Sequence, residues 1–327
     1  PPGRIIFAGV GKTRSEMAFA LEAGILAFNV ESESELLALS AAAAGLGKTA
    51  HIAIRVNPDV DPKTHEKIST GKAENKFGIP FEAAPALYAR AAQLPGIAVS
   101  GIHMHIGSQI TDLAPFREAF TLLRELAVTL RKAGHKLTHL DLGGGLGVPY
   151  LDGNELPPRP EEYATIVRET VGDLGLELVF EPGRLIVGNA GILVTRVLYV
   201  KSGPVKSFAI VDAAMNDLIR PTLYGAHHDI VPVRAPAPGA LPVIVDVVGP
   251  VCESGDYLAK DRSLPALTEG DLIAVMTAGA YGAVQAGTYN TRLLVPEVLV
   301  KGDQWALVRP RQTYEELIGL DRMAPWL

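Results

Sequence analysis

The chain has 327 residues, 48% of them hydrophobic and 20% charged, which describes a globular protein long enough for two domains. A formal net charge of −6 without a block of Lys or Arg argues against nucleic acid or a membrane surface as partner and favours a small-molecule ligand. Cys252 is the only cysteine, which excludes an intrachain disulfide and fits a reducing cytoplasm. We expect neither a membrane span nor a signal peptide.

Six apolar runs rich in β-branched and aromatic residues predict strands in the first part of the chain. They cover residues 5–10, 25–30, 51–56, 99–106, 137–142 and 176–180. Helical patterns lie between most of them, with capping-box signatures at Thr13-x-x-Glu16 and Ser32-x-x-Glu35 and helix-ending glycines at Gly24, Gly45 and Gly134. This alternation predicts a parallel sheet covered by helices on both faces. Residues 59–78 form the one long interruption, which we expect to be a loop on the functional face.

After Arg184 the composition changes: Val, Ile, Gly and Pro become frequent, and few helical patterns are present. Strands are predicted at residues 192–201, 208–211, 241–248, 272–276, 295–300 and 305–308, and a Pro/Ala-rich surface loop at 234–242. We therefore expect two domains, residues 1–186 and an all-β domain of residues 187–327.

Six parallel strands suit either a doubly wound sheet or a (β/α)8 barrel. No G-x-G-x-x-G turn follows the first strand, and no switch point is obvious, so we predict a TIM-like barrel that lacks its first two strand-helix units in this chain. Those units would amount to about 60 residues. The start at Pro1, without Met and almost directly before a strand, agrees with this expectation.

Polar residues or glycines lie at the carboxyl ends of four consecutive predicted strands, either within the last residues of the strand or directly after it. Barrel active sites are built at these strand ends. Arg55 belongs to the third strand, His103 and His105 to the fourth, the glycines 143–145 to the fifth and Glu181 to the sixth. Packing alone does not explain such a distribution. We expect these groups to meet at one rim.

The glycine tract Gly143-Gly144-Gly145 permits positive φ and leaves room for backbone N–H groups to converge on an anion. It therefore predicts a phosphate grip. A flexible turn is the alternative, and the tract by itself does not decide between the two.

Alternation along a strand would place His103 and His105 on one face. A hydrogen-bonded core histidine is the commoner outcome, and an imidazole stacked on a planar cofactor, with Ser108 donating to its phosphate, is the next. Because no carboxylate partner lies at matched spacing, we assign no metal to this pair.

The motif Glu181-Pro182-Gly183-Arg184 combines an acid, a rigid turn and a guanidinium. The carboxylate can hold a heteroaromatic nitrogen protonated, and the arginine can bind a carboxylate or phosphate in a planar fork. An ordinary salt bridge is the alternative.

Three further motifs lie in loops of the predicted β domain. Cys252-Glu253-Ser254-Gly255-Asp256 places a thiol between loop-forming and acidic residues, so an exposed functional thiol competes with a buried structural one. Arg220-Pro221-Thr222-Leu223-Tyr224 and Gly279-Ala280-Tyr281-Gly282 are similar loop motifs, each weak alone.

In this order the motifs resemble the fold-type III pyridoxal-phosphate decarboxylases, the group that includes ornithine and diaminopimelate decarboxylases. The resemblance runs from Arg4 to Leu320 and is greatest to the branch that acts on diaminopimelate. The pieces that carry it are DPKTH at 61–65, STG at 69–71, NKFG at 75–78, HIGSQ at 105–109, GGGLG at 143–147 and CESGD at 252–256. It implies decarboxylation of meso-2,6-diaminopimelate to L-lysine and CO₂ with pyridoxal 5'-phosphate as cofactor.

The resemblance also implies roles for residues of the first domain. His105 would stack on the pyridine ring and Glu181 would pair with its nitrogen. The cofactor phosphate and its surroundings would involve Ser108, Gly144, Gly145, Pro182, Gly183 and Arg184.

It also implies contacts to substrate, made by Arg184 of the first domain and by residues of the second. Arg184, Arg220 and Tyr224 would hold the distal carboxylate, Glu253 would meet the distal ammonium, and Tyr281 would border cofactor and substrate. Cys252 would return a proton to Cα. Because Cys252 and Glu253 reach the other subunit's site in this family, a homodimer is implied.

One family motif is missing. The Schiff-base lysine of the family lies in a Tyr-Ala-x-Lys-Ala-Asn-like segment on the first barrel strand, and this sequence has no such segment. Lys12 matches a lysine after a later strand and is not assigned that role. Three alternatives therefore stay open: a D-amino-acid or ornithine/arginine-type decarboxylase, a non-catalytic homologue, and a metal-dependent barrel hydrolase that uses His103, His105 and His139.

Overall fold

The computed structural model describes residues 1–72, 74–150, 156–236, 238–239 and 241–326. It divides the chain into two compact units. Unit 1 comprises Pro1–Val148 and Glu155–Leu185, and unit 2 comprises Pro149–Asn154 and Ile186–Leu327. Among the described residues, none of the helices combines the length and apolar character that a membrane crossing requires.

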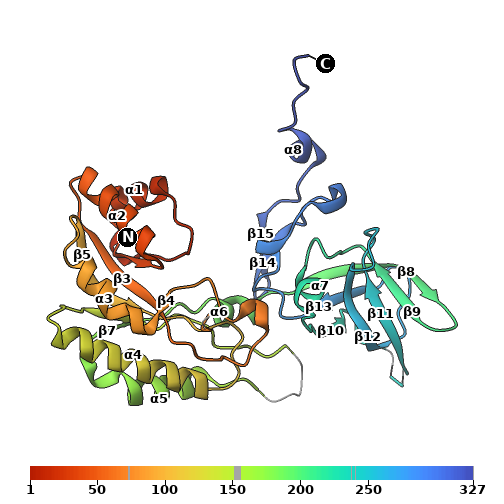
Figure 1. Ribbon diagram of the computed structural model, residues 1–327. Coiled ribbons are helices and arrows are strands. Elements are labelled where there is room, and N and C mark those ends of the chain that lie inside the picture. The colour runs from red at the N-terminus through yellow and green to blue at the C-terminus, as the bar shows by residue number, and fades with distance from the viewer. Residues whose placement is uncertain (73, 151–155, 237, 240, 327) are drawn as a thin grey trace. The chain divides into compact units, whose positions relative to one another are not determined.

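Unit 1 is built on a parallel sheet whose strands follow one another in chain order (Figure 1). The strands are β1 (Ile6–Phe7), β2 (Ala27–Val30), β3 (Ala50–Asn57), β5 (Ile97–His103), β6 (His139–Asp141) and β7 (Glu177–Val179), with β4 (Ile79–Pro80) paired to the end of β3. A doubly wound sheet reverses its strand order at a switch point, whereas a barrel adds each strand beside the last. The sequential order confirms the predicted barrel-type fold, and all six predicted strands are present.

Five helices connect these strands: α1 (Arg14–Ala23), α2 (Glu33–Gly45), α3 (Ala84–Ala91), α4 (Ala114–Lys132) and α5 (Pro160–Thr170). Thr13 and Glu16 form the predicted capping box. Ser32 also caps its helix by accepting from the Glu35 N–H, but the Glu35 carboxylate does not close the box because it binds Lys12 and the Glu31 N–H. Helices α4 and α5 lie side by side (Figure 1).

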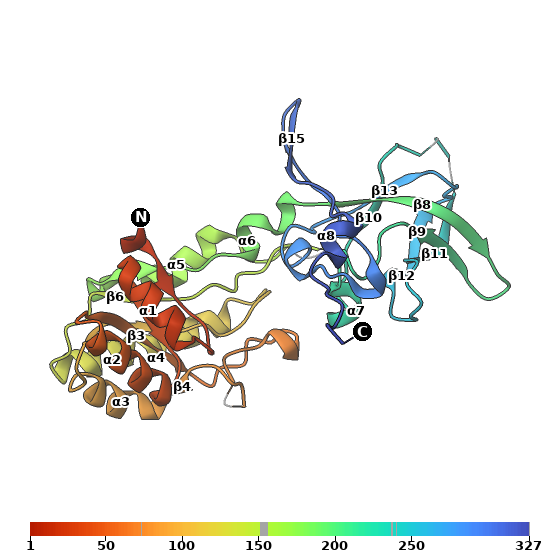
Figure 2. The ribbon, with the colours of Figure 1, turned by 90° about the horizontal axis from the view of Figure 1, so that it is seen from above.

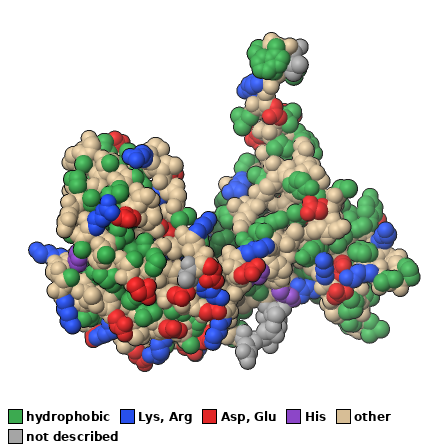
Figure 3. All heavy atoms as spheres, in the orientation of Figure 1, with side chains coloured by type: hydrophobic (Ala, Val, Ile, Leu, Met, Phe, Trp, Pro, Cys, Tyr) green, Lys and Arg blue, Asp and Glu red, His purple; other side chains and the backbone are tan. Residues whose placement is uncertain are grey.

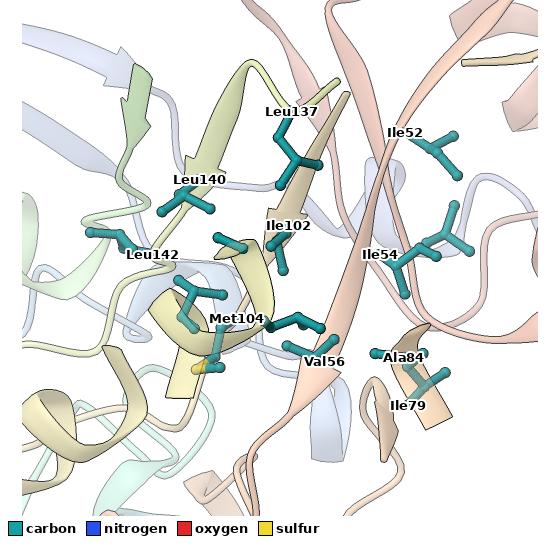
Figure 4. Close-up of a cluster of buried hydrophobic side chains, with 14 of the residues drawn as sticks. Ile52, Ile54, Val56, Ile79, Ala84, Ile102, Met104, Leu137, Leu140 and Leu142 are labelled. Atoms are coloured by element: carbon teal, nitrogen blue, oxygen red, sulfur yellow. The ribbon is translucent and has the colours of Figure 1, made fainter. Parts of the chain in front are cut away.

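The core of unit 1 lies between the sheet and these helices. Ile52 and Ile54 on β3, Ile102 on β5 and Leu140 on β6 are fully buried, and Figure 4 shows them on adjacent strands. Burial of each such side chain stabilises the fold by about 1.5–3 kcal/mol. This apolar layer holds the strand ends in fixed register.

Lys12 and Asn29 belong to a buried polar network at the carboxyl end of the sheet. The Lys12 ammonium donates to the carbonyls of Gly9 and Asn29, each at 2.7 Å, and pairs with Glu35 at 2.6 Å. The Asn29 amide donates to Asp141 Oδ2 at 2.8 Å. Lys12 therefore ties β2 and α2 together, a structural role consistent with its having no assigned part in chemistry.

A second buried ion pair attaches the loop of residues 59–78 to the strand ends. Arg55 Nη1 lies 2.9 Å from Glu31 Oε1, and its guanidinium lies 4.8 Å from the centre of the Phe77 ring. Glu31 also accepts a 3.2 Å hydrogen bond from the Gly78 N–H. The predicted loop, which contains a short 3-10 turn at Glu66–Ile68, is thereby held against β2 and β3.

Unit 2 is dominated by a six-stranded sheet in the order β10-β13-β8-β9-β11-β12. Its strands are β8 (Leu193–Ser202), β9 (Ser207–Val211), β10 (Ile230–Pro232), β11 (Pro242–Val248), β12 (Tyr257–Pro265) and β13 (Leu272–Val275). Three short α-helices remain among the described residues: α6 (Arg184–Val187), which begins at the end of unit 1, α7 (Arg220–Tyr224) and α8 (Tyr314–Ile318). The hairpin of β14 (Glu297–Lys301) and β15 (Gln304–Arg309) projects from the sheet (Figure 2).

The predicted β character of this part is confirmed, but two of its strands were not predicted. β10 is only three residues long, and β12 carries Lys260, Asp261, Arg262 and Ser263 in succession, which hides its apolar positions. The predicted loop of residues 234–242 gives way to β11 at Pro242, and its residues 237 and 240 lie outside the described residues.

We predict that burial of His103 makes unit 1 sensitive to acid. Its side chain is 1% exposed, and burial is the main cause that lowers its pKa from 6.5 to about 4. As the pH falls, the unfolded chain therefore takes up this proton before the folded protein does. The free energy of unfolding keeps its full value above pH 6.5 and decreases by up to about 3 kcal/mol as the pH falls towards 4.

The measurement is the unfolding midpoint of the wild type and of His103→Asn between pH 4 and 8. The variant should show a shallower loss on acidification. His51→Asn, which changes an exposed histidine on β3, is the control and should keep the wild-type slope. Parallel curves for wild type and His103→Asn would contradict the prediction.

Candidate functional site

The glycine tract after β6 lies in backbone contact with the segments that follow β5 and β7. A Cβ built on Gly143 would lie 2.5 Å from the Met104 carbonyl oxygen, and one on Gly144 would lie 2.2 Å from that of Glu181. Gly145, at φ +109°, would place its Cβ 2.3 Å from the Gly107 oxygen. No side chain fits at these distances, so glycine is required here for close packing as well as for backbone freedom.

The hydrogen bonds of the tract limit how many of its backbone N–H groups can converge on an anion, as the sequence predicts. The Gly143 N–H donates to Asp141 Oδ1 and the Gly144 N–H donates to His105 Nδ1, both at 3.1 Å. Two of the three donors are therefore used within the protein. Among the described residues the Gly145 N–H has no hydrogen-bond partner, and it is the amide that remains for a ligand.

His105 is oriented by this contact. Because Nδ1 accepts from Gly144, the neutral ring carries its proton on Nε2. Burial, followed by the nearby Arg55 charge, lowers the pKa of His105 to about 4, so the ring is neutral at pH 7. His105 lies beyond the end of β5 at His103, so strand alternation does not govern its direction, contrary to the prediction that both histidines share one strand face.

Ser108 and Arg184 come together from the segments after β5 and β7. Arg184 Nη2 donates to Ser108 Oγ at 3.0 Å, and Arg184 is 6% exposed. The Ser108 backbone is fixed by Thr64 Oγ1 at 2.8 Å and by the Ile68 carbonyl at 3.1 Å. Pro182 and Gly183 precede this arginine and are exposed, and a Cβ on Gly183 would meet no atom within 4 Å.

Glu181 lies beside two buried groups, His103 and Asp141. Its carboxylate keeps 33% of the side chain exposed, and Oε2 lies 3.5 Å from His103 Nε2. Burial raises the pKa of Asp141, and the negative charge of Glu181 raises it further. The rim therefore presents one accessible carboxylate above a buried histidine and a buried acid.

The potential ligand atoms of His103, Asp141 and Glu181 lie within 4.8 Å of one another, a spacing that an ion could bridge. This is not the group of three histidines considered from the sequence. His105 Nδ1 is used by Gly144, and His139 Nδ1 lies 3.2 Å from Thr138 Oγ1. The described residues thus do not support a centre made of His103, His105 and His139.

The sequence prediction missed three polar residues of this region: Asn29, Glu31 and Asp141. All are nearly or fully buried. Their signal was a polar residue within or directly after an apolar strand, as in Phe28-Asn29-Val30-Glu31 and Leu140-Asp141-Leu142. A buried polar group requires a partner, and here Asn29 donates to Asp141 while Glu31 pairs with Arg55.

In unit 2 the segment of Cys252 and Glu253 is held by Asp256. The Asp256 carboxylate accepts from the Val251 and Met215 N–H groups, each at 2.6 Å, and Asp256 is 4% exposed. Cys252 and Glu253 themselves are exposed, which resolves the choice between a buried and an exposed thiol. Tyr289 hydrogen-bonds Glu253, which raises the pKa of the tyrosine.

Arg220 and Tyr224, predicted to lie in a loop, instead begin and end the short helix α7, which lies next to this segment. Thr222 Oγ1 on α7 donates to the Gly255 carbonyl at 2.5 Å, which joins the two motifs. Tyr224 Oη accepts from Gln285 at 3.3 Å. Tyr281, 40% exposed and at φ +57°, lies in the loop that follows β13. The predicted site residues of unit 2 thus come from helix α7 and from two loops.

Comparison with known proteins agrees with this arrangement. The family model described as "Pyridoxal-dependent decarboxylase, pyridoxal binding domain" matches residues 1–188. The diaminopimelate decarboxylase of Zymomonas mobilis is 50% identical over 327 residues, which are 100% of this chain and 77% of that relative. The enzyme of Pseudomonas aeruginosa is 54% identical over 324 residues, 99% of this chain and 77% of the relative.

A solved structure shows the same architecture. The crystal structure of diaminopimelate decarboxylase from Helicobacter pylori complexed with L-lysine has a TM-score of 0.93 and 42% identity, covering 98% of this chain and 79% of that one. The family model covers more than half of the chain, and the relatives match both units, so the chain belongs to the pyridoxal-dependent decarboxylase family, among its diaminopimelate decarboxylases.

Proposed function

We propose that the protein is a carboxy-lyase that converts meso-2,6-diaminopimelate to L-lysine and CO₂ with pyridoxal 5'-phosphate. The observation that carries this proposal is the rim of unit 1, where Glu181, a neutral His105, and the Ser108–Arg184 pair flank the Gly145 amide. The Helicobacter pylori relative was solved with L-lysine, the expected product.

The residues at this rim fit the cofactor chemically. A phosphate requires donors and a backbone that it can approach, which Gly145, Gly183 and the Ser108–Arg184 pair offer. Gly144 fixes the His105 ring, and Pro182 fixes the turn that leads to Arg184. When bound, pyridoxal phosphate supplies an electron sink for the pair left by the departing carboxylate.

Glu181 keeps a proton on the pyridine nitrogen in this proposal. The neighbouring histidines support that role because burial keeps both His103 and His105 neutral, so neither contributes a positive charge that would compete for the carboxylate. His105 presents an aromatic ring whose tautomer is fixed by Gly144. The anionic Glu181 and the neutral rings thus favour a cationic heterocycle.

The residues of unit 2, with Arg184, would bind and protonate the substrate. Arg184, Arg220 and Tyr224 would hold the distal carboxylate, Glu253 the distal ammonium, and Tyr281 would border both ligands. Cys252 would return a proton to the carbon that loses CO₂, a role that its exposed thiol permits. We assign residues 1–186 to cofactor binding and 187–327 to the C-terminal β domain.

We further propose a homodimer in which Cys252 and Glu253 serve the partner's site, located in the cytoplasm as the single cysteine suggests. The hairpin β14–β15 supports an interface, since Leu299, Val300 and Trp305 are 63%, 66% and 72% exposed. Figure 3 shows hydrophobic side chains on the surface of this segment. Val300 and Trp305 are paired across the hairpin and Leu299 points to its opposite face, so apolar side chains are exposed on both faces. Exposed apolar surface of this kind marks association sites.

Glu181→Gln tests the central assignment. A neutral amide cannot stabilise the protonated ring nitrogen, so we expect kcat for L-lysine formation to fall by about a hundredfold or more while the cofactor still binds. Activity is measured by CO₂ release and cofactor binding by its absorbance. Glu177→Gln, on the strand β7 that precedes Glu181, is the control. A Glu181→Gln enzyme with wild-type kcat would refute the assignment.

Gly145→Ala and Gly183→Ala form a matched pair. The added methyl collides with the Gly107 carbonyl in the first variant and meets nothing within 4 Å in the second. We expect Gly145→Ala to lose about 1–3 kcal/mol of stability and most cofactor affinity, while Gly183→Ala keeps its melting temperature. Thermal unfolding and cofactor titration provide the readouts, and equal behaviour of both variants would contradict the packing argument.

The dimer is tested with Leu299→Asp/Trp305→Asp. Placing two charges on the hairpin should shift the mass measured by light scattering from dimer to monomer and abolish activity, because shared sites are lost. Val205→Asp, at a 96% exposed position in the turn between β8 and β9, is the control. A hairpin variant that stays dimeric would show that another surface forms the interface.

A further inference from the structure

Arg220 is held by two residues that the assigned site does not include, His228 and Tyr150. Arg220 Nη1 lies 2.7 Å from His228 Nε2, and the guanidinium carbon lies 4.5 Å from the centre of the Tyr150 ring. The Tyr150 and His228 rings are themselves in edge contact, 5.2 Å apart at 83°. Arg220 is 5% exposed and His228 0%, so this cluster is part of the interior of unit 2.

The hydrogen bonds of His228 define its tautomer. Nδ1 lies 2.9 Å from the Met276 carbonyl, which only accepts, so Nδ1 carries the proton. Nε2 then offers a lone pair, and Arg220, which only donates, supplies the hydrogen. Burial lowers the pKa of His228 to about 4, which keeps the ring in this neutral form.

The histidine is itself anchored. Its carbonyl oxygen accepts from Arg262 Nη2 at 3.1 Å, and its Nδ1–H is fixed to the strand end at Met276. An acceptor with so little freedom fixes one edge of the guanidinium, while the Tyr150 ring covers a face. Neither contact carries a negative charge, so both orient Arg220 without neutralising it.

We propose that His228 and Tyr150 are positioning residues that aim the Arg220 guanidinium at the distal carboxylate of the substrate and so determine selectivity for ligands that retain this carboxylate. The inference rests on the proposed function, in which Arg220 binds that group. Planar, bidentate recognition depends on the direction of the guanidinium. A loosely held arginine would bind the same carboxylate more weakly and less selectively.

Two ligands separate this role from a general effect on the site. Decarboxylation removes one carboxylate of diaminopimelate, and L-lysine keeps the distal one. Pentane-1,5-diamine has the same two amines and no carboxylate. Calorimetric titration of the holoenzyme with each ligand therefore measures the contribution of the carboxylate contact alone.

For His228→Leu we expect L-lysine affinity to fall by about tenfold, with the affinity for pentane-1,5-diamine unchanged. KM for diaminopimelate should rise by a similar factor, with kcat within about threefold. His228→Gln, whose amide can both accept from Arg220 and donate to Met276, should recover most of the loss. Tyr150→Leu should reproduce the loss in part, and Tyr150→Phe should not.

His227→Gln is the matched control, because His227 is the adjacent histidine and its side chain is 30% exposed. Equal weakening of both ligands in His228→Leu, or no recovery in His228→Gln, would overturn the positioning role. If His228→Leu does not fold, the comparison of Tyr150→Leu with Tyr150→Phe decides. A wild-type enzyme that neither binds L-lysine nor decarboxylates diaminopimelate would refute the proposed function itself, whatever the His228 variants do.

Discussion

The close approach of three backbone segments at the glycine tract is the constraint on which the rim of unit 1 depends. Met104, Gly107 and Glu181 each place a carbonyl oxygen where a Cβ of the tract would be. The same contact aligns the Gly144 N–H with His105 and the Gly143 carbonyl with the Glu181 N–H. Because the glycine tract has no side chains, the segments that follow the two neighbouring strands can lie against it in fixed positions. Functional groups from separate segments are thereby brought together at the carboxyl end of the sheet.

Burial then decides which of these groups carry charge. His103 and His105 lose their protons to desolvation, whereas Glu181 retains contact with solvent. Arg55 and Lys12 are also buried, but each is compensated by a carboxylate, Glu31 and Glu35. The result is a rim whose accessible carboxylate is not neutralised by the surrounding histidines. Such a surface is suited to a cationic heterocycle with an anionic substituent.

Much of this could be predicted from the sequence because the signals are local. Strand runs, the Thr13 cap and the polar residues at strand ends depend on near neighbours in the chain. The use of the Gly143 and Gly144 amides depends instead on Asp141 and on His105, which is 39 residues away from Gly144, and no local pattern encodes that contact. β12 was missed for a related reason, since its polar run Lys260 to Ser263 is explained by partners such as Asp246 that precede it in the chain. The features that could not be predicted therefore depend on contacts between residues that are distant in sequence.

The two units use neutral imidazoles in opposite ways. In unit 1 a neutral His103 lies beside an anion, Glu181, and in unit 2 a neutral His228 accepts from a cation, Arg220. A protonated ring would neutralise the first group and repel the second. Desolvation avoids both outcomes, since burial makes the charged imidazole the costlier form in either setting. The charges that would bind ligand therefore remain on Glu181 and Arg220, and the histidines contribute direction rather than charge.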